Sequence, residues 1–220
     1  MTIYERALQF LADGDAVGLG SGRAASAFIR LLGDRVREGM RVRGVPTSQA
    51  SARLARDCGV PLVELGDALP LAVTVDGADE VDPNLDLIKG YGRALVREKV
   101  VAASSRRLVI LVDTSKLVPV LGSRGKLPVE VVPFALPLCR RRLLALGCPP
   151  IPYEVDGRLF ATDNGNHILD CQVGPIADPA ALEQAIRVIP GVVGTGLFVG
   201  MADTALVQDG GTVQIMQGNP

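Results

Sequence analysis

Short apolar runs alternate with helical patterns through the first half of the chain, and this order predicts a parallel α/β sheet. The predicted strands are residues 16–19, 42–46, 62–65, 71–75 and 108–112, and the predicted helices are residues 22–37, 49–57 and 93–104. Several of these strands are apolar at consecutive positions, which is typical of parallel strands that are covered on both faces. We therefore expect a Rossmann-like, open and mostly parallel sheet with helices on both faces.

The pattern changes near Pro128 and predicts a smaller α+β domain. Strands are expected at residues 129–132, 152–155 with 158–162, 167–173 and 194–199, and helices at residues 136–146 and 179–188. This strand–helix–strand–strand–helix–strand order is that of a ferredoxin-like module. The expected organisation is a Rossmann-like catalytic domain of residues 1–127 and 204–220, into which a ferredoxin-like domain of residues 128–203 is inserted.

The composition is that of a globular protein without a nucleic-acid partner. Apolar residues make up 48% of the 220 positions, which is enough to build a sizeable core. Lys and Arg number 23 against 24 Asp and Glu, so the chain lacks the basic excess of a nucleic-acid binder. The chain also has no Trp, five Phe and three Tyr, which leaves few rings for stacking on bases.

The ends and the cysteines predict a cytoplasmic protein without a membrane partner. The N-terminal segment MTIYERALQF carries an acid and a base before any apolar run, which disfavours a signal peptide. No apolar run approaches the roughly 20 residues that a membrane helix requires. Cys58, Cys139, Cys148 and Cys171 form no closely spaced pair, so reduced thiols are favoured over disulfides or a zinc site.

A glycine-rich turn at residues 18–25 follows the first predicted strand and opens a helix. Backbone N–H groups at such a helix start can hold a phosphate, although packing glycines in a tight turn are the alternative. Arg23 stands where a dinucleotide fingerprint requires its third glycine, so that ligand class is disfavoured. The next strand-to-helix turn carries Thr47 and Ser48, for which a helix N-cap is a sufficient explanation.

Carboxylates are concentrated in the segment TVDGADEVD, directly after the strand at residues 71–75. Open α/β sheets bind ligands at the carboxyl ends of their strands, which favours Asp76 and Asp79 as site residues. Mg²⁺ held by these two carboxylates and a substrate phosphate stays open as an alternative. Glu80 and Asp82 are interpreted as residues that shape or solvate the following turn.

The segment KGYGRALVREK, residues 89–99, supplies a second anion-binding turn beside Lys89. Glu98 is expected in the second turn of the following helix, where a partly buried carboxylate would suit a general base. An exposed glutamate balanced by Arg97 and Lys99 is the alternative. Lys116 follows another strand end, where it could pair with a phosphate or lie on the surface. His167 is the only histidine, and a structural role is favoured for it.

In this order, the segments GLGSG, GVPTS, VDGADEVD, KGYG with REK, DTSK with VPVLG, LPVEVVPF, TDNGNHILD and IPGVVGTGLF resemble ribose-5-phosphate isomerases of the A type. The resemblance implies reversible conversion of ribose 5-phosphate to ribulose 5-phosphate by a homodimer or tetramer, without cofactor or metal. It implies that Glu98 is the base that moves a proton through an enediol(ate), and that Asp76 assists ring opening. Lys89 and Asp79 would handle hydroxyl protons and the developing oxyanion.

The resemblance also implies which residues contact the substrate. They are Ser21, Gly22, Arg23, Ala24, Asp76, Gly77, Ala78, Asp79, Lys89, Gly90, Tyr91, Gly92 and Lys116. The chain departs from the family where Arg23 and Ala24 replace two hydroxyl residues, and where Tyr91 and Arg93 interrupt a glycine run. We hypothesise that Arg23 compensates as a phosphate ligand, because a guanidinium can bind phosphate through two hydrogen bonds.

Two other functions fit parts of the pattern. A sugar-phosphate sensor on the same fold would keep the phosphate turn, but it would tolerate loss of the acid–base set that this chain retains. An acyl-CoA transferase-like enzyme would use Glu98 as a nucleophile and form a covalent adduct with a thioester substrate. Both rank behind the isomerase.

Overall fold

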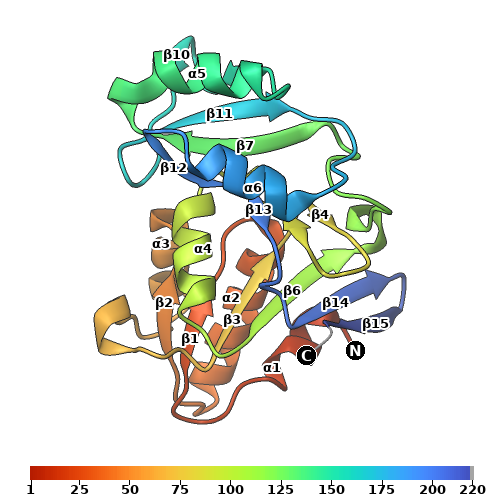
Figure 1. Cartoon of the computed structure of the whole chain (residues 1–220). Helices are drawn as coiled ribbons and strands as arrows, with labels where there is room; N and C mark the ends of the chain where they lie inside the picture. The colour runs from red at the N-terminus through yellow and green to blue at the C-terminus, as the bar shows by residue number, and fades with distance from the viewer. Residues whose placement is uncertain (219–220) are drawn as a thin grey trace. The chain divides into compact units, whose positions relative to one another are not determined.

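The computed structural model describes residues 1–218, and the chain groups into two compact units (Figure 1). The first unit comprises Met1–Ala78, Arg97–Lys116 and Gly200–Pro220, and the second comprises Asp79–Val96 and Leu117–Val199. Residues 79–96 group with the second unit because β4 (Glu80–Val81) and β5 (Leu87–Ile88) form a sheet with β13 (Leu197–Phe198). These bounds differ from the predicted domains, whose division stays a prediction.

Within residues 1–218, the first unit contains a six-stranded sheet in the order β15-β14-β6-β3-β1-β2. The strands are β1 (Ala16–Leu19), β2 (Arg43–Pro46), β3 (Val73–Gly77), β6 (Leu108–Asp113), β14 (Thr204–Asp209) and β15 (Thr212–Gln217). All neighbouring pairs are parallel except β14 with β15. The predicted mostly parallel, open sheet is therefore confirmed. The predicted strand at residues 62–65 is wrong, since Leu62 makes one isolated bridge to Gly44 and a 3-10 turn, η1 (Leu65–Asp67), follows.

Alternate residues of β1 explain why helices cover both faces of this sheet. Val17 and Leu19 pack in a cluster with Phe28 of α2 (Arg23–Arg37), whereas Ala16 belongs to a second cluster with Val101 of α4 (Leu95–Ala103). Successive side chains of a strand point to opposite faces, so the two clusters lie on opposite sides. The helices are α1 (Ile3–Leu8), α2 (Arg23–Arg37), α3 (Gln49–Asp57), α4 (Leu95–Ala103), α5 (Leu136–Ala145) and α6 (Pro179–Arg187).

Helix α4 begins two residues later than predicted. Arg93 has φ of +67°, a left-handed conformation that a right-handed helix cannot contain. The helix therefore starts at Leu95, and Glu98 lies in its first turn rather than its second.

The second unit has the strand order of the predicted ferredoxin-like module. Its antiparallel sheet, among the described residues, runs β12-β7-β11-β8. The strands are β7 (Lys126–Val131), β8 (Pro150–Pro152), β11 (His167–Gln172) and β12 (Val192–Thr195), and a small hairpin joins β9 (Glu154–Val155) to β10 (Arg158–Leu159). Helix α5 follows β7 and α6 follows β11, as the strand–helix–strand–strand–helix–strand order requires.

The remaining short elements are η2 (Thr114–Lys116) and η3 (Pro133–Ala135). In the part of the chain that the structure describes, every helix is too short or too polar to cross a bilayer.

Candidate active site

Asp76 lies in β3, near the carboxyl end of that strand, and the glycine-rich turn is built around its carboxylate. Asp76 is only 1% exposed, and its Oδ1 accepts hydrogen bonds from the backbone N–H groups of Ser21 at 3.0 Å and Gly77 at 2.8 Å. A Cβ on Gly20 would lie 2.1 Å from this oxygen, so no other residue fits there without a shift. Gly20 is thus explained by the close approach of Asp76.

The hydroxyl of Ser21 anchors the same turn from the other side. Its Oγ lies 2.8 Å from Thr47 Oγ1, 2.8 Å from Ser48 Oγ and 3.1 Å from Ser51 Oγ. Ser51 Oγ in turn donates to the carbonyl of Gly20 at 2.7 Å. Ser48 is the N-cap of α3, accepting from Ser51 N–H at 3.0 Å, so the predicted capping role is confirmed. Sequence reasoning missed the hydroxyl cluster because its members lie up to 30 residues apart.

Arg23 and Lys116 are both near Asp113, at the carboxyl end of β6. Arg23 is the exposed first residue of α2, and Lys116 is the half-buried last residue of η2. Hydrogen bonds from Ser115 lower the pKa of the Asp113 carboxyl, and the positive charges of Lys116 and Arg23 lower it further. Arg23 and Lys116, the two cations named as substrate contacts, therefore both act electrostatically on Asp113.

Glu98 is a buried residue of the first unit. It lies in the first turn of α4 and is 3% exposed. The alternative of an exposed helical glutamate is therefore wrong. Carboxylates are almost never this buried unless they are paired or functional.

Lys89 and Asp79 lie at the ends of the paired strands β4 and β5 in the second unit. Asp79 N–H donates to the carbonyl of Ile88 at 2.8 Å, and Lys89 N–H donates to the carbonyl of Gly196 at 2.8 Å. Lys89 is 3% exposed, and its Nζ lies 5.4 Å from the ring centre of Phe198. The structure thus brings these two predicted residues together by strand pairing.

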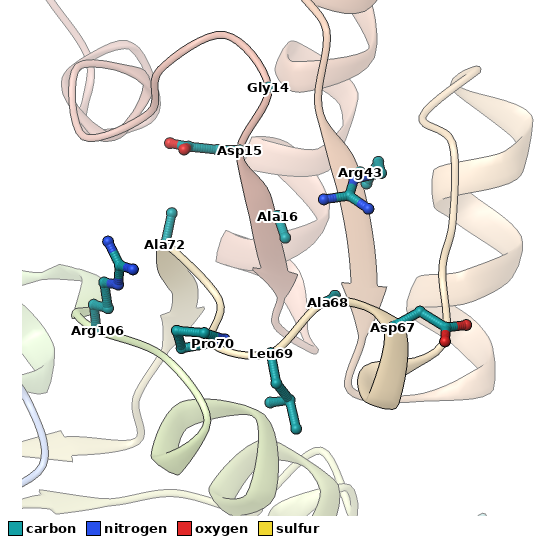
Figure 2. A pocket seen from close by; sticks show the side chains of 10 residues that line it. All are labelled: Gly14, Asp15, Ala16, Arg43, Asp67, Ala68, Leu69, Pro70, Ala72 and Arg106. Carbon is teal, nitrogen blue, oxygen red and sulfur yellow. The ribbon is translucent and has the colours of Figure 1, made fainter.

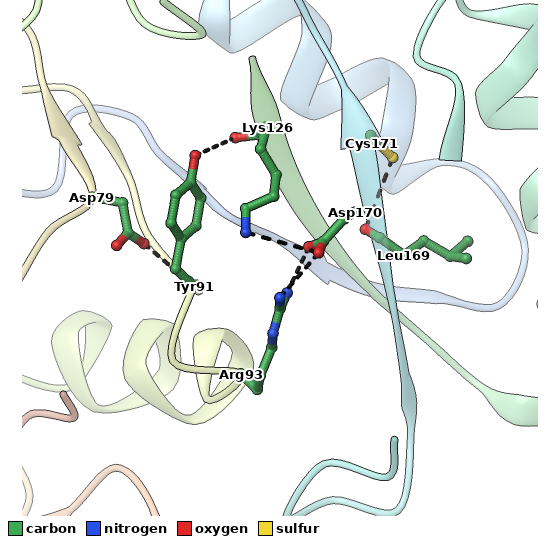
Figure 3. Close-up of polar contacts among 7 residues, drawn as sticks. All are labelled: Asp79, Tyr91, Arg93, Lys126, Leu169, Asp170 and Cys171. Atoms are coloured by element: carbon green, nitrogen blue, oxygen red, sulfur yellow. Dashed lines mark hydrogen bonds and ion pairs between the residues drawn. The ribbon is translucent and has the colours of Figure 1, made fainter. Parts of the chain in front are cut away.

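Tyr91 and Arg93 direct their side chains toward the second unit's own sheet (Figure 3). Tyr91 Oη donates to the carbonyl of Lys126 at 3.1 Å, and Arg93 forms an ion pair with Asp170. Burial raises the pKa of the Tyr91 phenol, and the carboxylate of Asp79 raises it further. A contact between the substrate and Tyr91 stays a prediction, but the Tyr91 hydroxyl already donates to the carbonyl of Lys126.

The predicted site residues divide between the two units. The first unit contains Ser21, Gly22, Arg23, Ala24, Asp76, Gly77, Ala78, Glu98 and Lys116, and the second contains Asp79, Lys89, Gly90, Tyr91 and Gly92. Ala24 and Gly77 are neighbours, since a Cβ on Gly77 would lie 3.6 Å from that of Ala24. Among residues 1–218, no group of three or more His, Cys, Asp or Glu side chains is arranged to hold a metal ion. A chelator assay decides the metal alternative.

Of the two roles expected for Glu80 and Asp82, shaping a turn is confirmed and solvation is wrong. Both are buried, and each organises a backbone turn. Glu80 accepts from the N–H groups of Gly122 at 2.6 Å and Arg124 at 2.8 Å, while Asp82 Oδ1 accepts from the N–H of Asn84 at 2.9 Å. The four carboxylates of the cluster therefore have separate structural environments, which a strand-end rule alone could not reveal.

A buried glutamate in β7, Glu130, was missed by the sequence analysis. Its Oε1 accepts from Thr162 Oγ1 at 3.0 Å and from the side-chain amides of Asn164 at 3.0 Å and Asn166 at 2.9 Å. The sequence signal for this glutamate was the polar run TDNGNH, because its side-chain hydrogen-bond donors require an acceptor when they are buried. His167 Nδ1 lies 2.8 Å from the carbonyl of Phe160, in keeping with a structural role.

A polar cavity of about 280 Å³ lies at the end of the first unit's sheet that is opposite to Asp76 (Figure 2). Its lining includes Asp15, Arg43, Asp67 and Arg106, around the amino ends of β1, β2 and β3. It is therefore separate from Asp76 and from the strand ends where the site was predicted.

Comparison with known proteins identifies the family. A family model described as "Ribose 5-phosphate isomerase A (phosphoriboisomerase A)" matches residues 43–211. The chain belongs to the ribose 5-phosphate isomerase A family. Ribose-5-phosphate isomerase A of Roseiflexus castenholzii is 53% identical over 206 residues, which are 92% of this chain and 88% of that protein. That of Gloeobacter violaceus is 50% identical over 216 residues, covering 98% and 94%.

Solved structures of ribose 5-phosphate isomerases share the fold. The ribose 5-phosphate isomerase A of Methanocaldococcus jannaschii matches with a TM-score of 0.93 at 39% identity, over 98% of this chain and 96% of that one. A D-ribose-5-phosphate isomerase in complex with phospho-erythronic acid matches with a TM-score of 0.93 at 36% identity, over 97% and 95%. The predicted family, α/β fold and class of enzyme are thereby confirmed.

Proposed function

We propose that the protein interconverts D-ribose 5-phosphate and D-ribulose 5-phosphate, and that Glu98 is the general base. The observation that carries the proposal is the burial of Asp76, Lys89 and Glu98, at the positions where the family resemblance assigns chemistry. Burying an ionisable side chain costs free energy, so such groups concentrate where their reactivity is used. The same substrate is supported by relatives named ribose-5-phosphate isomerase A and by the similar D-ribose-5-phosphate isomerase structure that contains phospho-erythronic acid.

In the proposed reaction the carboxylate of Glu98 takes the proton from C2 of the open-chain aldose. The C2–H electron pair forms the C1–C2 double bond of an enediolate, and the C1 carbonyl oxygen becomes the oxyanion. Return of the proton from Glu98 to C1, with transfer of a hydroxyl proton from O2 to O1, gives the ketose. No net oxidation occurs, so the balance requires no cofactor.

The other groups serve the steps around this proton transfer. Asp76 takes the anomeric hydroxyl proton as the bond between C1 and the ring oxygen breaks, and returns that proton to the ring oxygen. Asp79 moves the proton between O1 and O2. The ammonium of Lys89 stabilises the oxyanion. Because the oxyanion develops only along the reaction, this interaction lowers the barrier more than it strengthens substrate binding. The two backbone hydrogen bonds to Asp76 Oδ1 hold one oxygen in place.

We propose that the phosphate binds at the start of α2, between Arg23 and Lys116. The helix N-terminus offers backbone N–H groups, and the two side chains add positive charge near Asp113. We also propose a homodimer, for which the exposed apolar side chains of Phe134 and Val188 provide support. Light scattering of the purified protein tests the dimer.

The decisive experiment is an assay of ribose 5-phosphate conversion in excess chelator, with Glu98→Gln as the variant. We expect full wild-type activity and a fall in kcat of at least ~10²-fold in the variant, because glutamine cannot take a proton. Activity that returns only with Mg²⁺ would overturn the roles of Asp76 and Asp79. Binding without turnover would favour the sensor, and a covalent Glu98 adduct with a thioester would favour the transferase.

A further inference from the structure

The turn that follows Lys89 has an unfavourable backbone conformation. Arg93 N–H donates to the carbonyl of Gly90 at 2.9 Å, which closes the turn. The φ of Arg93 is +67°, a region that is unfavourable for a residue with a Cβ. Other contacts must therefore stabilise Arg93 in this conformation.

The side chain of Arg93 provides the first of these contacts (Figure 3). Its Nη1 and Nη2 donate to Oδ1 of Asp170 at 2.5 Å and to Oδ2 at 3.0 Å. The guanidinium carbon lies 3.6 Å from the ring centre of Tyr153, and the ion pair is mostly buried, with side-chain exposures of 10% for Arg93 and 16% for Asp170. A two-bond pair that is also stacked fixes the orientation of the guanidinium as well as its distance.

The side chain of Tyr91 attaches the same turn to the neighbouring strand. Its hydroxyl donates to the carbonyl of Lys126 at 3.1 Å, and Lys126 Nζ lies 3.9 Å from the centre of the Tyr91 ring. Lys126 Nζ also lies 3.8 Å from Asp170 Oδ2. Lys126 begins β7 and Asp170 lies in the adjacent β11, so two paired strands hold the turn.

The backbone of this turn reaches a residue of the proposed reaction. Tyr91 N–H donates to Oδ2 of Asp79 at 2.9 Å. A carboxylate bonded in this way changes its orientation when the turn moves. The ion pair of Arg93 and Asp170 is therefore connected to Asp79 through the turn and one backbone N–H group.

The ion pair is poorly explained by stability alone. Arg93 Nε is buried and has no hydrogen-bond partner among residues 1–218. A buried ion pair contributes little net stability, because desolvation offsets much of its attraction. The clearer consequence of the ion pair is that it fixes the orientation of the Arg93 side chain.

We propose that Arg93, held by Asp170, is a positioning residue that sets the orientation of the Asp79 carboxylate beside Lys89. The proposal rests on the proposed function for the roles of Asp79 and Lys89. Loss of the ion pair lets the turn relax toward an ordinary backbone conformation and moves the Tyr91 N–H group. The reaction then slows while the substrate, held mainly through its phosphate, still binds.

The test compares Arg93→Ala and Arg93→Lys with the wild type, with Arg142→Ala on the exposed side of α5 as the matched control. For both Arg93 variants we expect kcat to fall ~10–100-fold with KM within about 2-fold, since a displacement of about 1 Å costs up to ~10²-fold. Lysine does not restore kcat, because it lacks the planar two-bond geometry. The control retains wild-type values.

A second measurement does not depend on activity. Hydrogen exchange followed by NMR should show the Tyr91 amide exchanging at least ~10-fold faster in Arg93→Ala, while amides in β7 and β11 keep their protection. Adding Asp170→Ala to Arg93→Ala should cause no further loss of kcat, because the two residues act as a unit.

Each other outcome overturns the proposal. A near-normal kcat, or a lowered kcat with unchanged exchange of the Tyr91 amide, would show that Arg93 does not act on the reaction by orienting Asp79. Faster exchange throughout β7 and β11 assigns Arg93 a purely structural role. If the wild type fails to isomerise ribose 5-phosphate, the proposed function fails, and the exchange measurement still decides whether the ion pair holds the turn.

Discussion

Replacing Gly20 with alanine tests whether the glycine turn exists to accommodate Asp76. The added Cβ would lie 2.1 Å from Oδ1, 2.3 Å from Cγ and 2.6 Å from Cβ of Asp76. Rotating the Asp76 side chain about its Cα–Cβ bond moves the first two atoms but leaves the third, so the backbone must shift. Restoring an ordinary contact of 3.4 Å to the Cβ of Asp76 requires a backbone displacement of about 0.8 Å.

Two effects of different size follow from this displacement. Overpacking of this kind costs about 1–3 kcal/mol of stability, and each kcal/mol lowers Tm by about 2–4 °C in a chain of this length. The catalytic effect is larger, since a displacement of about 1 Å costs up to ~10²-fold in rate. We therefore expect Gly20→Ala to remain folded, with kcat reduced ~10–100-fold.

The assay is steady-state isomerisation with thermal unfolding measured on the same preparations. Gly66→Ala is the matched control, because a Cβ there meets nothing within 4 Å. It should retain both kcat and Tm. A Gly20→Ala variant with wild-type kcat would refute the reasoning that the turn and the Asp76 carboxylate share one fixed geometry. Equal losses in the two variants would do the same.

Two further predictions concern charge. Arg23→Ala should raise KM for the phosphorylated sugar about 10-fold with kcat unchanged, and added salt should shrink the difference because Arg23 is exposed; an unchanged KM contradicts a phosphate role. Burial raises the pKa of Asp82, with the charge of Asp86 adding to the shift, so the native state binds this proton more readily than the unfolded state. Stability from this group therefore rises as pH falls through the native pKa. In urea unfolding, the stability of Asp82→Asn relative to the wild type should fall as the pH is lowered from neutrality toward the ordinary range of a carboxyl group, and a difference that does not change with pH would contradict the shift.

The parallel sheet could be predicted because its signals are local. Apolar runs such as residues 108–112 and the helix at residues 49–57 depend on neighbours within a few positions, and both occur in the structure. The strand predicted at residues 62–65 failed because an apolar run does not reveal whether a partner strand is available. The start of α4 failed because no sequence rule assigns a left-handed φ to an arginine such as Arg93.

The candidate site could be predicted as positions but not as contacts. Ligands of open α/β sheets bind at the carboxyl ends of the strands, and this rule selects Asp76 from its position directly after a predicted strand. The contact between Asp76 and Gly20 joins residues more than 50 positions apart, and the burial of Glu80 depends on a turn near Gly122. Such pairings come from the tertiary fold, which is why the burial of Glu80 was not predicted and Glu130 was missed.

The strand order of the first unit has a consequence for how the chain folds during synthesis. β6 pairs on one side with β3 and on the other with β14, whose residues Thr204–Asp209 emerge about ninety positions later. Until then β6 presents an unpaired, apolar edge of the kind that other chains can join. The hairpin of β14 and β15 covers that edge, so pairing of β6 with another chain competes with folding until residues 204–217 have been synthesised.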